Sequence, residues 1–324
     1  MMYQREKLVV LKSSASLFPN NVSRVTVNGE TFAGVVHKDQ LNIVRPGTPE
    51  VEPRLVEAKV VTSSQSSLSI MQAAWVKVSS RTLLVLATTK GALFYDWDGS
   101  VLLYAHLLPP TPPDAPQAFT RGIAAIYSGY VCVGVHTGEV VVVRVSDEEV
   151  RTVEVVKKWH TRPITTLASH GLVLVSGDDE GVIKVAQDDQ LDQGFQNVCC
   201  IDTFGSPVTC LAAWGGQVVA AYLSGHIRIF NLQCGTIIAE VCGHARSITG
   251  LDIAKESGLM LTTSEDSYIR VWQLNPSSSD LPVEHKFGTV EENVALCGGA
   301  FTDDVGSGFF TTGYDRKDII CYAM

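Results

Sequence analysis

The fold is decided by the stretch Gly225-His226-Ile227-Arg228-Ile229-Phe230, whose pattern recurs along the chain. Its clearest copies are Gly181-Val182-Ile183-Lys184-Val185-Ala186 and Ser267-Tyr268-Ile269-Arg270-Val271-Trp272. Each copy begins with a turn residue and then alternates apolar with polar side chains, which is the period of a strand with one buried face. A single strand cannot bury that face alone, so the recurrence predicts a repeat architecture.

The position of Ile227 in this pattern recurs six times. The equivalent residues are Leu41, Ala92, Val140, Ile183, Ile269 and Ile319. With Ile227 included, successive positions are 51, 48, 43, 44, 42 and 50 residues apart, close to the ~40–45 residues of a four-stranded propeller blade. Seven positions predict seven blades, so the expected fold class is an all-β, seven-bladed β-propeller.

Turn residues place the strands within one unit. In the fifth unit, apolar-rich runs separated by glycine-containing turns predict strands at 208–213, 217–222, 227–231 and 236–242. The inner strands of five other units are expected near Met71, Ile123, Ile164, Ile248 and Leu296.

The last unit lacks one strand. It ends at Met324 directly after its third strand, whereas the run 7–12 at the other end of the chain is strand-like and belongs to no unit. We therefore expect this N-terminal run to be the outer strand of the last blade. It would close the ring and leave only short, protected edges. Residues 1–324 would then be one propeller domain.

Composition limits the cellular setting. The chain has 324 residues and a formal net charge of −9, so it lacks the basic stripe that binds nucleic acid or anionic membranes. No apolar run approaches the ~18 residues of a membrane helix, and the N-terminus lacks a signal-peptide pattern. The expected location is the cytoplasm, where all eight cysteines would be reduced.

The sixth unit carries a recognisable signature. Gly243-His244, followed by Ser264-Glu265-Asp266-Ser267-Tyr268-Ile269-Arg270-Val271-Trp272, resembles the WD repeat, with Gln273 where the final Asp usually stands. The resemblance implies a hydrogen-bonded set inside the blade, running from Trp272 through Thr262 and His244 to Asp266. Such a set satisfies buried polar groups, so its expected role is structural.

The other units keep less of this signature. In the fourth unit, His160 and Glu180 occupy the positions of the histidine and the aspartate, and Ala186 occupies the tryptophan position. Most units are therefore identified by the phase of their strands alone.

The whole chain also resembles one animal branch of the WD-repeat family. Matching stretches lie along its full length, at residues 32–37, 121–125, 244–246, 283–285, 295–301 and 312–315. The resemblance implies a non-catalytic scaffold or adaptor for protein partners in the cytoplasm, in signalling, vesicle or cilium-associated complexes. A ubiquitin-ligase substrate receptor is the alternative, although the Trp-Asp-x-Arg motif that such receptors often carry is replaced by Trp272-Gln273-Leu274-Asn275.

Motifs of catalysis are absent from the sequence. It contains no phosphate-binding glycine loop, nucleophile elbow, zinc-protease motif or calcium loop, and its eight histidines lack metal-ligand spacing. We therefore expect no catalytic residues, no metal and no cofactor. A propeller enzyme is the least favoured function.

Three arginines are the candidate partner-binding residues. Arg121, Arg162 and Arg246 stand at what the repeat indicates is one phase of blades three, four and six. In the WD-repeat family the loops before inner strands share one face of the ring, where three guanidinium groups would bind a carboxylate- or phosphate-bearing peptide. The alternative is that each arginine pairs with a local acid, such as Asp179 or Glu265, or caps loop carbonyls.

Overall fold

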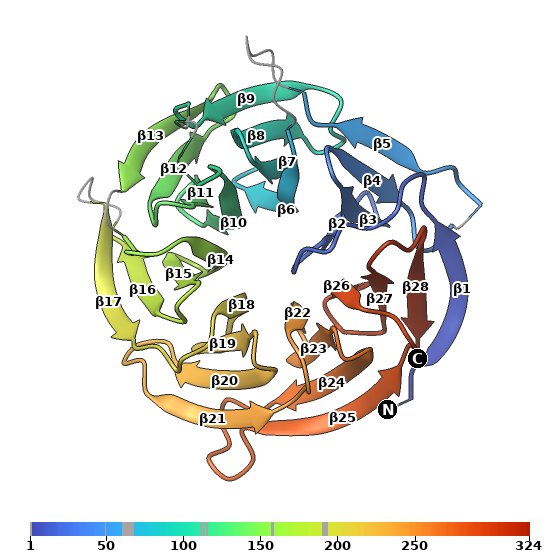
Figure 1. The fold of residues 1–324 in the computed structure, drawn as a ribbon. Coiled ribbons are helices and arrows are strands. Elements are labelled where there is room, and N and C mark those ends of the chain that lie inside the picture. The colour runs from blue at the N-terminus through green and yellow to red at the C-terminus, as the bar shows by residue number, and fades with distance from the viewer. Residues whose placement is uncertain are drawn as a thin grey trace.

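The computed structural model describes residues 2–48, 50–59, 68–110, 112, 114, 116–156, 159–189 and 194–324. Within these ranges the chain forms 28 β-strands and no helix. The strands make seven four-stranded sheets arranged as blades around a central axis (Figure 1). The prediction of an all-β, seven-bladed propeller is confirmed.

Each blade is an antiparallel sheet whose first strand lies nearest the axis. Blade one contains β2 (Val22–Val27), β3 (Glu30–His37), β4 (Gln40–Val44) and β5 (Arg54–Glu57). Blade two contains β6 (Ile70–Val78), β7 (Arg81–Thr88), β8 (Gly91–Asp96) and β9 (Leu102–Leu107). Blade three contains β10 (Thr120–Ile126), β11 (Tyr130–Val135), β12 (Val140–Val145) and β13 (Val150–Val156). Blade four contains β14 (Ile164–His170), β15 (Val173–Asp178), β16 (Ile183–Asp188) and β17 (Phe195–Ile201).

The remaining blades follow the same plan. Blade five contains β18 (Val208–Trp214), β19 (Gln217–Tyr222), β20 (His226–Asn231) and β21 (Ile237–Cys242). Blade six contains β22 (Ile248–Ala254), β23 (Leu259–Ser264), β24 (Tyr268–Leu274) and β25 (Val283–Val290). Blade seven contains β26 (Leu296–Phe301), β27 (Gly308–Gly313), β28 (Asp318–Ala323) and, as its outer strand, β1 (Gln4–Val10).

The repeating apolar position found in the sequence has one structural meaning. All seven of its residues lie in the third strand of their blades and have no exposed surface: Leu41, Ala92, Val140, Ile183, Ile227, Ile269 and Ile319. Each therefore fills an equivalent site in the packing between sheets, which is why this position tolerates only apolar side chains.

Apolar side chains fill the junctions between blades. Among the described residues they form seven clusters, and each cluster combines side chains from two adjacent blades. Between blades two and three, for example, Val85 and Phe94 belong to one cluster with Val131 and Val143. Because alternate side chains of a strand point to opposite faces, every sheet contributes to the junctions on both of its sides.

The N-terminal strand closes the ring. β1 pairs antiparallel with β28, with Val9 opposite Ile319, so the first and last segments of the chain share one sheet. This strand starts three residues before the predicted run 7–12 and ends two residues before its end. Tyr3 contributes at the same seam, because its hydroxyl donates to the carbonyl of Gly306 at 2.6 Å.

Two kinds of loop lie together on one side of the ring. The turns between second and third strands donate backbone hydrogen bonds of 2.8–3.1 Å to the loops that lead into inner strands. These bonds are Thr89 to Ser69, His136 to Phe119, Asp179 to Pro163, Leu223 to Pro207, Glu265 to Ser247 and Tyr314 to Ala295. We call the side formed by these turns and loops the ring face.

Candidate functional site

Blade six contains a continuous polar network. The Trp272 indole N–H donates to Thr262 Oγ1 at 2.9 Å, and Thr262 Oγ1 lies 2.9 Å from His244 Nε2. His244 Nδ1 lies 3.1 Å from both carboxylate oxygens of Asp266. The structure thus brings together all four residues that the WD signature implies, in the implied order.

The direction of each hydrogen bond follows from the donors available. An indole can only donate, so Thr262 accepts from Trp272 and gives its own proton to His244 Nε2. His244 Nδ1–H then donates to Asp266, which also accepts from the backbone N–H of Ala245 and Tyr268. Burial raises the pKa of the Asp266 carboxyl, but these hydrogen bonds outweigh burial and hold its pKa well below the usual range. These four side chains are hydrogen-bonded to one another inside the blade, which fits a structural role.

Blade four builds a similar network from different positions. His160 Nδ1 lies 2.8 Å from Asp178 Oδ2, and His160 Nε2 lies 2.8 Å from Ser176 Oγ. The indole of Trp159 donates to the same Ser176 hydroxyl at 2.7 Å. The assignment of Glu180 as the acid of this unit is therefore wrong. Asp178, two residues earlier, takes that role at the end of β15.

Blade four has Ala186 where blade six has Trp272, and the indole of Trp159 takes the place of the missing one. Trp159 directly precedes His160, in the place where Gly243 precedes His244 in blade six. A Cβ built on Gly243 would lie 3.5 Å from the Trp272 indole, so a side chain at this position points into the space that the indole fills. The adjacent Trp-His pair was the sequence signal for this second network.

We expect Trp159→Phe to lower the free energy of unfolding by about 1–2 kcal/mol, because it removes the indole donor of Ser176 from a buried network. Chemical denaturation followed by circular dichroism would measure the loss. Trp97→Phe is the matched control, since the Trp97 side chain is 36% exposed and donates no hydrogen bond to another described residue. Equal losses in the two variants would contradict a role for the Trp159 indole.

The three candidate arginines do not share one phase. Arg162 and Arg246 each lie two residues before an inner strand, on the ring face. Arg121 lies one residue inside β10, next to a bulge at which the pairing with β11 shifts between Thr120 and Ile123. The prediction of a common phase is wrong: the first paired residues of these inner strands are Thr120, Ile164 and Ile248, so Arg121 follows that position whereas Arg162 and Arg246 precede it by two residues.

The two ring-face arginines differ in their surroundings. Arg162 Nε donates to Asp179 Oδ1 at 3.0 Å, and Glu180 lies 3.6 Å away. Arg162 thus pairs with a local acid, as the alternative interpretation expected. Arg246 is exposed, and its side chain makes no hydrogen bond or ion pair with the part of the chain that the structure describes.

Arg121 instead helps to hold the chain's own loop at the axis of the ring. Its Nη2 donates to the carbonyl of Pro19 at 3.3 Å. The backbone N–H of Asn20 donates to Thr249 in blade six at 2.7 Å, and its side chain donates to Thr209 in blade five at 3.3 Å. One loop that touches blades three, five and six must lie near the axis, and Figure 1 shows the chain before β2 projecting there.

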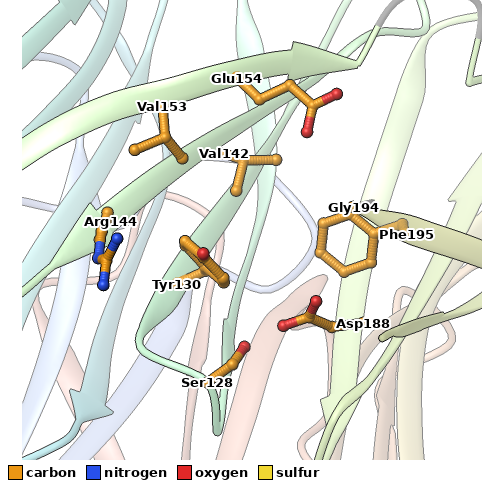
Figure 2. A pocket seen from close by; sticks show the side chains of 9 residues that line it. All are labelled: Ser128, Tyr130, Val142, Arg144, Val153, Glu154, Asp188, Gly194 and Phe195. Atoms are coloured by element: carbon orange, nitrogen blue, oxygen red, sulfur yellow. The ribbon is translucent and has the colours of Figure 1, made fainter. Parts of the chain in front are cut away.

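A pocket of about 490 Å³ lies between blades three and four (Figure 2). Its nine lining residues include the acids Glu154 and Asp188, the cation Arg144 and the hydroxyls of Ser128 and Tyr130, but no histidine. Histidine is the side chain that most often serves as a general base, so this lining differs from the usual surroundings of a hydroxyl nucleophile.

Three further observations concern the described residues. No three or more His, Cys, Asp or Glu side chains in the described ranges are grouped so that they could hold a metal ion. Nothing in those ranges is a helix of the length and apolar character needed to cross a membrane. All eight cysteines are free thiols.

Comparisons with known proteins agree with this architecture. The protein-family model described as WDR54 matches residues 2–324. The chain is 33% identical over 335 residues to WD repeat-containing protein 54 of Mus musculus, and 31% identical over 334 residues to that of Homo sapiens. Both alignments cover 98% of this chain and 98% of the relative.

A solved structure supports the fold independently. One chain from a crystal structure of the mitotic checkpoint complex superposes with a TM-score of 0.76, covering 99% of this chain and 95% of that chain. Its sequence identity of 12% makes it a likeness of fold alone. The family model over residues 2–324, together with relatives aligned over 98% of their length, shows that this chain belongs to the WDR54 family of WD-repeat propeller proteins.

Proposed function

We propose that the protein is a non-catalytic adaptor that binds protein partners through its ring face. Membership of a WD-repeat family suggests an interaction scaffold. The observation that carries the proposal is a group of large apolar side chains exposed on the ring face, namely Phe204, Leu223, Tyr268 and Tyr314. Aromatic and aliphatic side chains exposed near arginines are typical of surfaces that other proteins cover.

These side chains have no structural need to be exposed. Leu223 is 50% and Tyr314 is 55% exposed, each in a turn between a second and a third strand. The two His–acid pairs, by contrast, are held inside blades six and four by the networks around His244 and His160. Binding of partner proteins at the ring face is therefore favoured over chemistry at the axis of the ring, where the loop containing Asn20 is held.

The test is partner capture with tagged protein from cells, followed by mass spectrometry. We expect Leu223→Ser combined with Tyr314→Ser to lose most captured partners while leaving the melting temperature almost unchanged. The matched control is Tyr127→Ser combined with Val305→Ser. These side chains are 87% and 52% exposed, and they lie in turns between first and second strands, outside the ring face.

The identity of the captured proteins separates the alternatives. Cytoplasmic signalling, vesicle or cilium-associated complexes would support the adaptor, whereas ligase subunits would indicate a ubiquitin-ligase receptor. If both double variants capture the same partners as the unmodified protein, the ring face is not the binding surface.

The arginine hypothesis gives a second prediction. We expect Arg162→Glu combined with Arg246→Glu to weaken capture of an acidic or phosphorylated partner at least several-fold, because two cations of the ring face become anions. Arg121 is left unchanged, since its guanidinium contacts Pro19 inside the ring. Titration of the captured partner against the double variant measures the effect, and unaltered affinity would remove these arginines from the binding surface.

A further inference from the structure

Cys199 of blade four contacts the blade-five turn that carries Cys234, at the outer edge of the ring. Cys199 lies on β17 of blade four, and its thiol reaches the turn that joins β20 to β21 in blade five. Cys199 Sγ–H donates to the carbonyl of Leu232 at 3.8 Å. A Cβ built on Gly235 would lie 3.3 Å from the same sulfur. Cys234 stands between these two contacts in the sequence, so its thiol is carried by the segment that Cys199 touches.

A peroxide-reactive pair needs one thiol that reacts first with the peroxide and a second that reacts with the first, and the two thiols differ in this way. Cys234 is exposed in its turn, and its Sγ lies 3.1 Å from Thr236 Oγ1. The hydrogen bond from Thr236 lowers the pKa of the Cys234 thiol, which favours the nucleophilic thiolate. Cys199 is half-buried, and burial, followed by the nearby Cys234 and Cys200 thiols, raises its pKa. Cys234 is thus the thiol that would react first.

We propose that Cys199 and Cys234 form an oxidation-sensitive pair that a hydroperoxide converts into a disulfide between blades four and five. In the first step the Cys234 sulfur attacks the terminal peroxide oxygen, breaks the O–O bond and becomes a sulfenic acid, and the thiol proton leaves with the other oxygen, as water from hydrogen peroxide or as an alcohol from an organic hydroperoxide. In the second step the Cys199 sulfur attacks the Cys234 sulfur, forms the S–S bond and releases the sulfenic oxygen as water. Two thiols lose two electrons, and the peroxide gains them.

The surroundings favour this pairing over the other candidate. Cys200 is exposed and adjacent in sequence, but neighbouring strand positions point to opposite faces of a sheet. Of these two cysteines, only Cys199 contacts the blade-five turn among the contacts described. Gln233 and Cys234 are both exposed, and their backbone N–H groups are held by Asn231. To reach Cys199, the Cys234 thiol exchanges its exposed contact with Thr236 for the S–S bond.

The experiment treats the dilute full-length protein with hydrogen peroxide and counts thiols after denaturation. We expect the loss of two of its eight thiols in a monomeric product, with a Cys199–Cys234 cross-link in the peptide mass spectrum. Cys200→Ser should give the same product. Cys199→Ser should stop at a sulfenic acid on Cys234 that dimedone labels, and Cys234→Ser should retain its remaining thiols. A cross-link between other cysteines, a disulfide-linked dimer or no loss of thiols would overturn the proposal.

Discussion

Deletion of residues 1–12 is expected to destabilise the entire ring and to remove its single cooperative unfolding transition. The deleted segment contains all of β1, so β28 loses its partner strand and blade seven is left with three strands. It also contains the buried side chains of Tyr3, Val9 and Leu11. Removing three such side chains from the core costs about 5–8 kcal/mol of burial, comparable with the whole stability of a typical domain at about 5–15 kcal/mol.

Two point variants in β1 test whether the buried side chains of this strand, and not only an N-terminal extension, stabilise the ring. Val9 and Val10 are adjacent in β1, but Val9 is 2% exposed and Val10 is 63% exposed. We expect Val9→Ser to lower the free energy of unfolding by about 2–4 kcal/mol and Val10→Ser to change it by less than about 0.5 kcal/mol. Urea denaturation measures both. A deleted protein that unfolds in one steep transition at the original midpoint would show that closure by β1 is dispensable.

The seven-bladed fold could be predicted from the sequence for a simple physical reason. The seven third-strand positions, from Leu41 to Ile319, are all fully buried, so each must be apolar and the repeat is visible without any alignment. Closure by the N-terminus followed from counting strands, because a propeller with an unpaired outer position exposes an edge. The predicted run 7–12 begins three residues later than β1 does, since the first residues of the strand, Gln4 and Arg5, are exposed and carry no apolar pattern.

The errors in the site arose where local geometry departs from the repeat. Arg121 has a different phase because the first paired residue of the inner strand is Thr120 in blade three but Ile164 and Ile248 in blades four and six. An apolar pattern therefore aligns Ile123 with those isoleucines, three residues too late. Asp178 was overlooked because it ends a strand in which every residue is buried, so it gave no sign of polar alternation. The loop at the axis, around Asn20, has no repeat equivalent and could be placed only from the structure.

Asp266→Asn is expected to lower the free energy of unfolding by about 2–4 kcal/mol at neutral pH. The Asp266 carboxylate accepts hydrogen bonds from His244, Ala245 and Tyr268, and an asparagine must turn its NH₂ group toward one of those donors. A donor left unsatisfied in a buried network loses its hydrogen bond and keeps the cost of its desolvation. Denaturant unfolding at neutral pH measures the loss.

The pH dependence supplies a sharper test. The folded-state pKa of Asp266 is lowered by its hydrogen bonds despite the opposing effect of burial, whereas an unfolded aspartate titrates near 3.9. The stabilisation is therefore fully present above about pH 4 and is lost as the pH falls toward the folded pKa. The difference in stability between the unmodified protein and Asp266→Asn should shrink over that acidic range. A difference that stays constant as the pH falls would contradict a stabilising charge.

Two further variants separate the charge from the rest of the network. Thr262→Val removes the hydroxyl that accepts from Trp272 and lies against His244, so it should cost about 1–3 kcal/mol. It keeps the Asp266 carboxylate, and the loss of stability in acid should therefore persist. Asp280→Asn, in the exposed segment before β25, should change neither the stability nor its pH dependence. Only a buried carboxylate held by donors combines both effects, and that combination is what distinguishes a structural network from a reactive His–Asp pair.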